Sequence, residues 1–575
     1  MKFGIFPRYQ DIFPGKSIPL LKDVLARSSS KTMLRVFAYM NSTVHMMQED
    51  IEAQETSFRG WIGIFDEETR ISIWKNYQSF KRQIIAEGDA VVLYASSAIL
   101  RLIEQIILNY NDIPEPPKKS AADEMIWFEA WLINNATFDL EVAENTKHEI
   151  DNLLGVLVVN QATQYESIGR KDFIYQTLLA HAFFKFLSDD LKHSPFLQEF
   201  LSRKQVATYG EYLRHILGVY AGPFEKRGNS FGFQIGEDED SAKAIHFFDS
   251  IAYDLTESPF SQLSNSQTDP DYKIIRSKPL IKEENGQYYP LHYNFFVDKL
   301  YQGLVFDFYT NTSIQSLHKN FGQFLGYLGQ EFAEQYLFNE YLPLCFFPKK
   351  YVLSVPGTQI IGIEYSDFYV REGNVLYLFE FKNSMVSAPI KHSKNFATIK
   401  AEIIKKLVYN PDNKKDKGIG QLINVIHKIE QGGFSFDDLS GKRVGRLQIY
   451  PVVVYTDDFF SLDGIQMILS EEFKNLLAVN PVKRHRVNDV TLIHLKDIID
   501  IQFMVQKGIV SFKGIMETYF VKKKAIAKKR PRSNQEVLNK YIDFRSMMHN
   551  TIRPFADEEA LRNRLMSALG LNQSA

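Results

Sequence analysis

The fold of this chain is decided by the stretch VLYLFEFK at residues 375–382. Side chains alternate between the two faces of a β-strand, so Glu380 and Lys382 would share one face with two leucines, while the other face would be wholly apolar. Because both faces are otherwise apolar, we expect a buried strand. A carboxylate and an ammonium group are costly in such a place unless they are paired or bind a metal. Glu380 and Lys382 are therefore candidate functional residues.

A second strand is predicted at residues 362–370, before a turn at residues 371–374. This hairpin would bring Asp367 within reach of Glu380. Two converging carboxylates are the hard oxygen ligands that Mg²⁺ prefers. A bound metal would polarise a phosphodiester and lower the pKa of a water, while Lys382 could orient that water or neutralise charge in the transition state. The pattern favours hydrolytic nuclease chemistry with Mg²⁺, for which Mn²⁺ could substitute.

The elements around this hairpin extend the pattern in both directions. Helical spacing precedes it at residues 313–341, a helix is expected near residues 420–431, and the apolar run at residues 447–456 is typical of a strand covered on both faces. The predicted order is therefore helix, strands, helix, strand.

These residues resemble the core of the PD-(D/E)XK nuclease superfamily, which has the restriction-endonuclease-like fold. The resemblance covers roughly residues 320–460 and lies in Ser366-Asp367-Phe368, followed after the aspartate by twelve residues and then Glu380-Phe381-Lys382. It implies a metal-dependent phosphodiesterase, with DNA favoured over RNA as the substrate because the superfamily acts mainly on DNA. It also implies a secondary catalytic role for Gln421. Some members place a further acidic ligand on the preceding helix, where Glu334 is our candidate and Glu331 the alternative.

A second Glu-Phe-Lys sequence, Glu472-Phe473-Lys474, provides an internal control. Its surroundings have helical spacing, and residues two apart on a helix point about 200° apart. We expect this copy to lie on a solvated helix. For Glu380 the competing interpretation is a structural ion pair, which would make the chain a non-catalytic nucleic-acid-binding or assembly protein with a degenerate nuclease fold.

Composition and charge describe an ordinary soluble chain with two unlike halves. The 575 residues include 67 Lys and Arg against 69 Asp and Glu, and 45% are hydrophobic. Residues 1–250 carry 26 basic and 34 acidic residues, which leaves the rest of the chain with a net charge of +6. No apolar run approaches the roughly 18 residues that span a bilayer, and the first residues lack a signal-peptide core. We expect a cytoplasmic protein without a membrane partner.

The basic residues after the central strand are predicted to contact a nucleic-acid backbone. Residues 382–430 hold ten basic residues against four acidic ones, and a solvated helix face is the alternative interpretation. The candidates are Lys391, Lys394, Lys414, Lys415 and Lys417.

The single cysteine, Cys345, lies among apolar neighbours and is interpreted as a buried small hydrophobic residue.

The predicted fold class is α/β, with a helical N-terminal region and a C-terminal restriction-endonuclease-like domain whose mixed β-sheet is flanked by helices. Four segments are expected: a helical accessory or recognition domain at residues 1–255, a junction containing a hairpin at Asn285-Gly286 at residues 256–312, the nuclease domain at residues 313–510, and a basic segment with a C-terminal helix at residues 511–575. The helical half could select a target, a protein partner or a second copy. Phage defence or restriction is the first hypothesis for the biological role.

Overall fold

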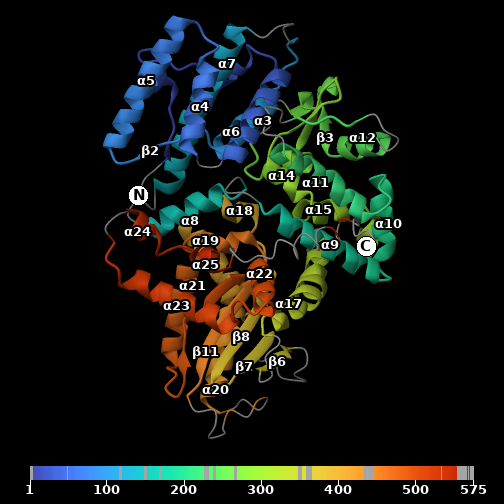
Figure 1. Ribbon diagram of the computed structural model, residues 1–575, viewed down its shortest axis with the longest axis vertical. Helices are drawn as coiled ribbons and strands as arrows, with labels where there is room; N and C mark the ends of the chain where they lie inside the picture. Colours follow the sequence, from blue (N-terminus) through green and yellow to red (C-terminus); the bar gives the residue numbers. More distant parts are fainter. Residues whose placement is uncertain are drawn as a thin grey trace. The chain divides into compact units, whose positions relative to one another are not determined.

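A computed structural model describes most of the chain (Figure 1). The described residues are 4–47, 50–114, 120–147, 152–166, 171–225, 232–236, 241–263, 268–346, 352–357, 366–432, 437, 439, 446–531, 534–552, 566 and 569. The chain divides into two compact units. The first comprises Met1–Glu144, Glu166–Leu317 and Asn563–Ala575, and the second comprises Asn145–Tyr165 and His318–Arg562.

The first unit is mainly helical, as the three- and four-residue spacing of apolar side chains predicts. Its helices are α1 (Tyr9–Ile12), α2 (Leu21–Leu25), α3 (Ser30–Met47), α4 (Ile51–Ile62), α5 (Glu67–Ala86), α6 (Ser96–Leu108), α7 (Ala121–Thr146), α9 (Phe173–Asp189), α10 (Ser194–Arg203), α11 (Tyr209–Glu225), α12 (Ser241–Asp249), α13 (Lys273–Ser277), α14 (Tyr293–Asp298) and α15 (Gln302–Thr310). Asp50 and Asp66 cap α4 and α5 by accepting hydrogen bonds from first-turn amides. Short helical turns η2 (Leu255–Glu257), η3 (Ser261–Leu263) and η4 (Ser313–Ser316) complete the helical part.

Two small sheets accompany these helices. Strands β1 (Gly4–Ile5) and β2 (Ala90–Val91) pair in parallel, while β3 (Ala252–Asp254), β4 (Leu280–Lys282) and β5 (Tyr288–Pro290) form a three-stranded sheet. β4 and β5 are antiparallel. The turn between them contains Gly286 at φ +76°, a left-handed conformation that glycine adopts without strain, so the predicted Asn285-Gly286 hairpin is confirmed.

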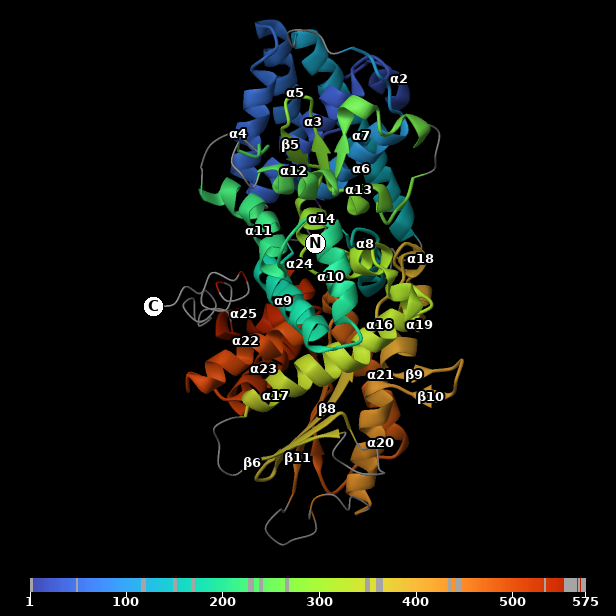
Figure 2. The same cartoon turned by 90° about the vertical axis from the view of Figure 1, so that its right-hand side faces the viewer.

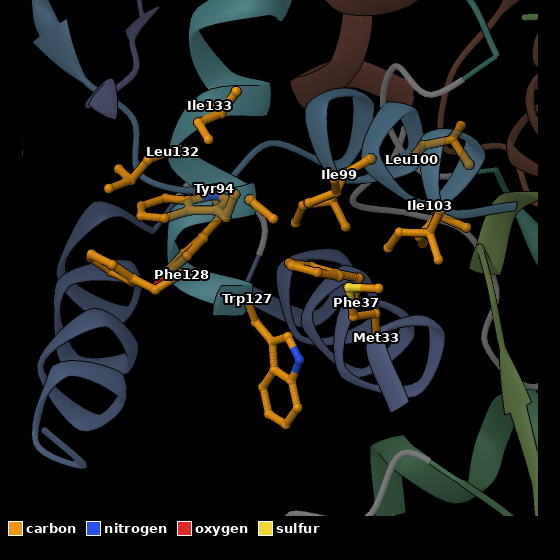
Figure 3. Packing of buried hydrophobic residues seen from close by; sticks show 14 of the residues in the cluster. Met33, Phe37, Tyr94, Ile99, Leu100, Ile103, Trp127, Phe128, Leu132 and Ile133 are labelled. Carbon is orange, nitrogen blue, oxygen red and sulfur yellow. The ribbon is translucent and has the colours of Figure 1, made fainter. Parts of the chain in front are cut away.

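The core of the first unit forms where α3, α6 and α7 meet (Figure 3). Phe37 from α3, Ile99 and Ile103 from α6, and Phe128 from α7 are fully buried there. Burial of such a side chain contributes roughly 1.5–3 kcal/mol, so this cluster is the main stabilising feature of the helical half.

The second unit contains a mixed sheet with the strand order β12–β11–β8–β7–β6, and β13 also pairs with β11. The strands are β6 (Val352–Pro356), β7 (Phe368–Glu372), β8 (Val375–Lys382), β11 (Gln448–Tyr455), β12 (Arg486–Val487) and β13 (Thr491–His494). β7 runs antiparallel to both of its neighbours, β6 and β8, whereas β8, β12 and β13 run parallel to β11. The predicted hairpin, the buried strand at residues 375–382 and the strand at residues 447–456 are confirmed. Residues 362–365 of the predicted first strand lie outside the described residues.

Helices cover both faces of this sheet (Figure 2). The helices of this unit are α8 (Leu153–Thr163), α16 (Phe321–Tyr327), the π-helix η5 (Leu328–Phe338), α17 (Asn339–Leu344), α18 (Ala388–Lys391), α19 (Phe396–Leu407), α20 (Gly418–Glu430), α21 (Ile465–Val479), α22 (Leu495–Gln506), α23 (Phe512–Lys528), α24 (Asn534–Leu538) and α25 (Phe544–Ile552). The unit also contains the turn η7 (Asp458–Ser461) and the hairpin of β9 (Tyr409–Asn410) and β10 (Lys415–Asp416). Leu376 and Leu378 share a core with α19, α20 and α21. Tyr377 instead contacts Phe346 and Phe512. The period-two face assignment is therefore confirmed.

The observed units divide the chain differently from the predicted segments. Residues 256–312 belong to the first unit, because β3 of the helical half pairs with β4 and the two cannot be separated. Residues 511–562 belong to the second unit, since Phe512 and Met516 are buried against it.

Cys345 is buried as predicted, and burial raises the pKa of its thiol. Among the described residues, none of the helices is long and apolar enough to cross a membrane.

Candidate functional site

Glu380 and Lys382 meet at the end of the central strand β8. Lys382 Nζ donates a hydrogen bond to Glu380 Oε2 at 2.8 Å, which the strand period allows because residues two apart lie on one face. The Glu380 side chain is only 1% exposed, while that of Lys382 is 15% exposed. The carboxylate is thus held inside the sheet, and the ammonium group lies at its boundary with solvent.

Asp367 joins this pair from the neighbouring strand. It directly precedes β7, and its Oδ2 accepts a hydrogen bond from the Phe381 amide at 2.7 Å and lies 3.6 Å from Lys382 Nζ. The side chain is 17% exposed. The hairpin therefore brings together Asp367, Glu380 and Lys382, as the sequence predicts.

Gly357, at the end of β6, fixes the backbone of Asp367. Its amide donates a hydrogen bond to the Asp367 carbonyl at 2.8 Å. A Cβ atom on Gly357 would lie 2.4 Å from the Ser366 carbonyl oxygen and 3.0 Å from Asp367 Cα. Since both neighbours are backbone atoms, only glycine permits this approach. Sequence reasoning missed Gly357, although a glycine at a strand end is a known sign of close backbone contact.

The electrostatics of the three residues are coupled. Burial raises the pKa of Glu380 well above its ordinary value; the negative charge of Asp367 adds to this shift, and Lys382 opposes it. Burial alone would lower the pKa of Lys382, but the charges of Glu380 and Asp367 outweigh it and raise that pKa. Two carboxylates therefore share one cation, in an environment that disfavours excess negative charge.

Of the two acidic candidates on the preceding helix, Glu334 acts electrostatically on the site. The negative charge of Glu334 contributes to the raised pKa of Lys382. Glu334 is partly buried, whereas Glu331 is exposed. Both lie in η5, and π-helical turns are rare and frequent at functional sites. Of the two acidic candidates on this helix, Glu334 is the one that interacts with Lys382.

The first turn of α20 lies against Lys382. The Cβ position of Gly418 is 3.5 Å from Lys382 Cε. Gln421, one turn further, has a buried side-chain oxygen, Oε1, without a hydrogen-bond partner. Such an atom usually requires a partner, so Gln421 can accept a hydrogen bond from a ligand or a water.

The carboxylate oxygens of Asp367 and Glu380 are chemically suitable ligands for Mg²⁺. Mg²⁺ commonly takes one or two carboxylates and keeps several waters, and Asp367 and Glu380 supply two hard oxygen donors. Asp367 and Glu380 would hold the ion, whose positive charge would offset the burial and the repulsion from Asp367 that raise the pKa of Glu380. Within the described ranges, no group of three or more His, Cys, Asp or Glu side chains is arranged to hold a metal ion. Glu334 therefore does not complete a three-carboxylate site with the other two.

The predicted nucleic-acid-binding lysines fall into two groups. Lys394, Lys414 and Lys415 are exposed and Lys417 is partly exposed. Lys414 and Lys415 belong to the β9–β10 hairpin, which projects from the unit just before α20 (Figure 2). Lys417 is the residue that precedes the first turn of α20.

Lys391 departs from the prediction. It is only 7% exposed, and its Nζ lies 3.8 Å from the centre of the Tyr165 ring. Tyr165 is fixed in turn by a hydrogen bond to Asp457 Oδ1. The ammonium group is therefore part of the interior, because an aromatic residue distant in sequence covers it, and Lys391 is not a surface contact for a phosphate backbone.

The control copy at Glu472 behaves as the helical pattern predicts. It lies on α21, where Glu472 pairs with Lys400 at 3.6 Å and Lys474 pairs with Asp489 at 3.4 Å. The two charges thus diverge to different partners while Phe473 is buried.

Comparisons of the chain with models of protein families, with curated proteins and with solved structures find no match. The arguments for function therefore come from the site itself.

Proposed function

We propose that the chain is a magnesium-dependent nuclease that hydrolyses phosphodiester bonds, with DNA as the favoured substrate. The proposal rests on one observation: Asp367 and Glu380 converge on Lys382 at the end of a buried strand. Isolated charges are seldom placed in such a position for stability alone, and perturbed titratable groups cluster at functional sites. DNA and a role in phage defence or restriction follow from the resemblance of Asp367, Glu380 and Lys382 to the PD-(D/E)XK pattern.

The three side chains have distinct roles in this proposal. Asp367 and Glu380 hold Mg²⁺, which supplies polarisation of the phosphodiester and a lowered pKa of a water. Lys382 orients the attacking water and offsets negative charge that grows on the phosphate oxygens in the transition state. Its raised pKa keeps it cationic at neutral pH, which suits charge stabilisation rather than proton abstraction.

Two neighbouring elements would place the substrate. Gln421, on the helix whose Gly418 approaches Lys382, has a buried side-chain oxygen without a hydrogen-bond partner and can accept a hydrogen bond from a water or a nucleotide. The exposed Lys414 and Lys415, with Lys417, carry positive charge on the segment that leads into α20 and can contact backbone phosphates.

The competing function is a non-catalytic nucleic-acid-binding or assembly protein. Lys382 already lies within 4 Å of both carboxylates, so the three residues can form a self-contained ion-pair network without a metal. In that case the protein would bind nucleic acid through its basic hairpin and leave it intact.

The deciding experiment compares the parent protein with two alanine variants, Glu380→Ala and Glu472→Ala. Each is incubated with plasmid DNA and with RNA in the presence of Mg²⁺, Mn²⁺ or a chelator. Glu472→Ala is the matched control, because it removes the same residue type from the same tripeptide at a solvated position.

We expect the parent and Glu472→Ala to cut DNA only with a metal, and Glu380→Ala to be at least about 100-fold slower. Equal cutting by all three proteins would reject Glu380 as a metal ligand. Binding of DNA without cutting by the parent would favour the non-catalytic function.

A further inference from the structure

The first unit contains a hollow of about 620 Å³ that is separate from the carboxylate site. It lies between one face of α3, the end of α4 and the β4–β5 hairpin, and helices α3, α4 and α7 can be located in Figure 1. Its volume is within the roughly 300–1,000 Å³ typical of small-molecule pockets. It opens to solvent beside Tyr39 and Ile64, which are 41% and 51% exposed.

Four aromatic side chains line the hollow: Tyr39, Trp61, Tyr94 and Tyr289. Trp61 is held rigidly, because its ring packs 5.1 Å from Phe128 and its indole N–H donates to Glu124 Oε2 at 2.9 Å. Figure 3 shows Tyr94 beside the side chains of α7. Fixed aromatic walls favour a flat, apolar ring as the occupant, since stacking on them costs little side-chain entropy.

The polar groups of the lining are balanced in charge. Arg35 and Glu124 contribute one positive and one negative group, and Ser57 adds a hydroxyl. Arg35 Nη1 is also paired with Glu283 Oε1 at 2.5 Å, outside the lining. Burial raises the pKa of the Tyr94 hydroxyl, and a hydrogen bond with Ser57 opposes that shift. The hollow thus offers both donors and acceptors without a net charge.

The aromatic walls and the two opposite charges of the hollow favour some classes of ligand over others. A quaternary ammonium would suit the aromatic rings but would be repelled by Arg35. A phosphate or carboxylate would face Glu124. A neutral planar ring with its own donors and acceptors can stack on Trp61 or Tyr39 and hydrogen-bond at its edge to both charged groups. We propose that the hollow binds the base of a free nucleoside, and guanosine is the first probe because its base presents adjacent N–H donors to a carboxylate.

A substitution at Gly60 can fill part of the hollow. Gly60 lines the hollow on helix α4, and a Cβ atom added to it meets nothing within 4 Å. Gly60→Phe would place a ring in the space, and replacing a helical glycine tends to stabilise the helix. Gly218→Phe is the matched control: Gly218 also lies in a helix of this unit, has open space at its Cβ position and is absent from the lining.

The experiment titrates the full chain with guanosine, adenosine, cytidine, uridine and choline, and follows binding by calorimetry and by tryptophan fluorescence. We expect saturable binding of at least one nucleoside, weakened at least tenfold in Gly60→Phe and unchanged in Gly218→Phe. Absence of nucleoside binding, preferential binding of choline, or equal binding by Gly60→Phe and the parent would each overturn the proposal. Thermal unfolding of each variant shows that it is folded. The result does not depend on whether the second unit cuts DNA.

Discussion

The same three residues, Glu-Phe-Lys, occur twice in the second unit and form two different structures. On β8 the glutamate and lysine lie on one face and pair with each other at 2.8 Å, together with Asp367. On α21 they point apart and pair with Lys400 and Asp489. The Glu380 side chain is 1% exposed, whereas that of Glu472 is 25% exposed.

The difference shows that secondary structure, rather than the tripeptide, creates the site. A two-residue separation brings side chains together on a strand and separates them on a helix. Burial then gives the strand copy its perturbed titration, because Glu380 is desolvated beside a second carboxylate. The helical copy has ordinary surface ion pairs, which contribute roughly 0–1 kcal/mol.

Replacement of Lys382 or of Lys474 should give the largest difference in cutting rate between the two Glu-Phe-Lys copies. Lys382→Met should slow metal-dependent DNA cutting at least about 100-fold, because the charge opposite the transition state is lost. Lys474→Met should leave cutting unchanged, since its ammonium pairs with Asp489 on the exposed side of α21. Initial rates of plasmid nicking measure both, and a similar loss in the two variants would break the contrast between the copies.

A substitution that displaces Asp367 without replacing it should have the next largest effect on the rate of DNA cutting. Gly357→Ala forces backbone atoms of Ser366 and Asp367 to shift, so we expect cutting to fall about tenfold or more while the variant stays folded. Gly326→Ala on α16 is the control, because its added Cβ meets nothing within 4 Å. Nicking rates and circular dichroism of both variants check this, and normal cutting by Gly357→Ala would show that the position of Asp367 is unimportant.

The basic hairpin should affect substrate affinity rather than chemistry. Alanine at Lys414, Lys415 and Lys417 should reduce the slope of log affinity against log salt by up to about 2.7, at roughly 0.9 per lost phosphate contact. Lys391→Met should not change this slope, because its ammonium lies over the Tyr165 ring; it should instead lower the free energy of unfolding by about 0.5–2 kcal/mol. Fluorescence anisotropy with labelled DNA at several salt concentrations measures the slopes, and an unchanged slope in the triple variant would remove the hairpin from the interface.

Glu380 should also link the stability of the fold to pH. The pKa of Glu380 is raised in the folded state, so between its unfolded and folded pKa values the native protein holds more protons than the unfolded chain. The stability from this group is therefore present at low pH and is lost as pH rises, by up to about 1.4 kcal/mol per pH unit.

Urea unfolding with a chelator from pH 5 to 8 tests this linkage. Glu380→Gln should remove that part of the decline with pH. Parallel profiles for the parent and Glu380→Gln would show that Glu380 titrates normally.

The strand part of the site was predictable because its information is local. Alternation in residues 375–382 identifies the strand and its charged face, and the apolar run at residues 447–456 identifies its parallel neighbour. Helical spacing likewise distinguishes Glu472 from Glu380.

The features that sequence reasoning missed depend on contacts between distant segments. Gly357 matters only because β6 runs beside Asp367, and Lys391 is buried only because Tyr165 covers it. The compact units divide the chain differently from the predicted segments for the same reason: β3 and β4 pair across the predicted boundary at residue 255. The hollow beside Trp61 is assembled from α3, α4 and the β4–β5 hairpin, and no local pattern marks it.

The most direct test of the central claim is to locate a bound metal ion. Crystals of the parent, Glu380→Ala and Glu472→Ala soaked in Mn²⁺ can be measured near the manganese absorption edge. We predict an anomalous peak about 2.0–2.2 Å from oxygens of Asp367 and Glu380 in the parent and in Glu472→Ala, and none there in Glu380→Ala. A parent crystal with no peak at these carboxylates, from protein that cuts DNA under the same metal, would contradict the claim.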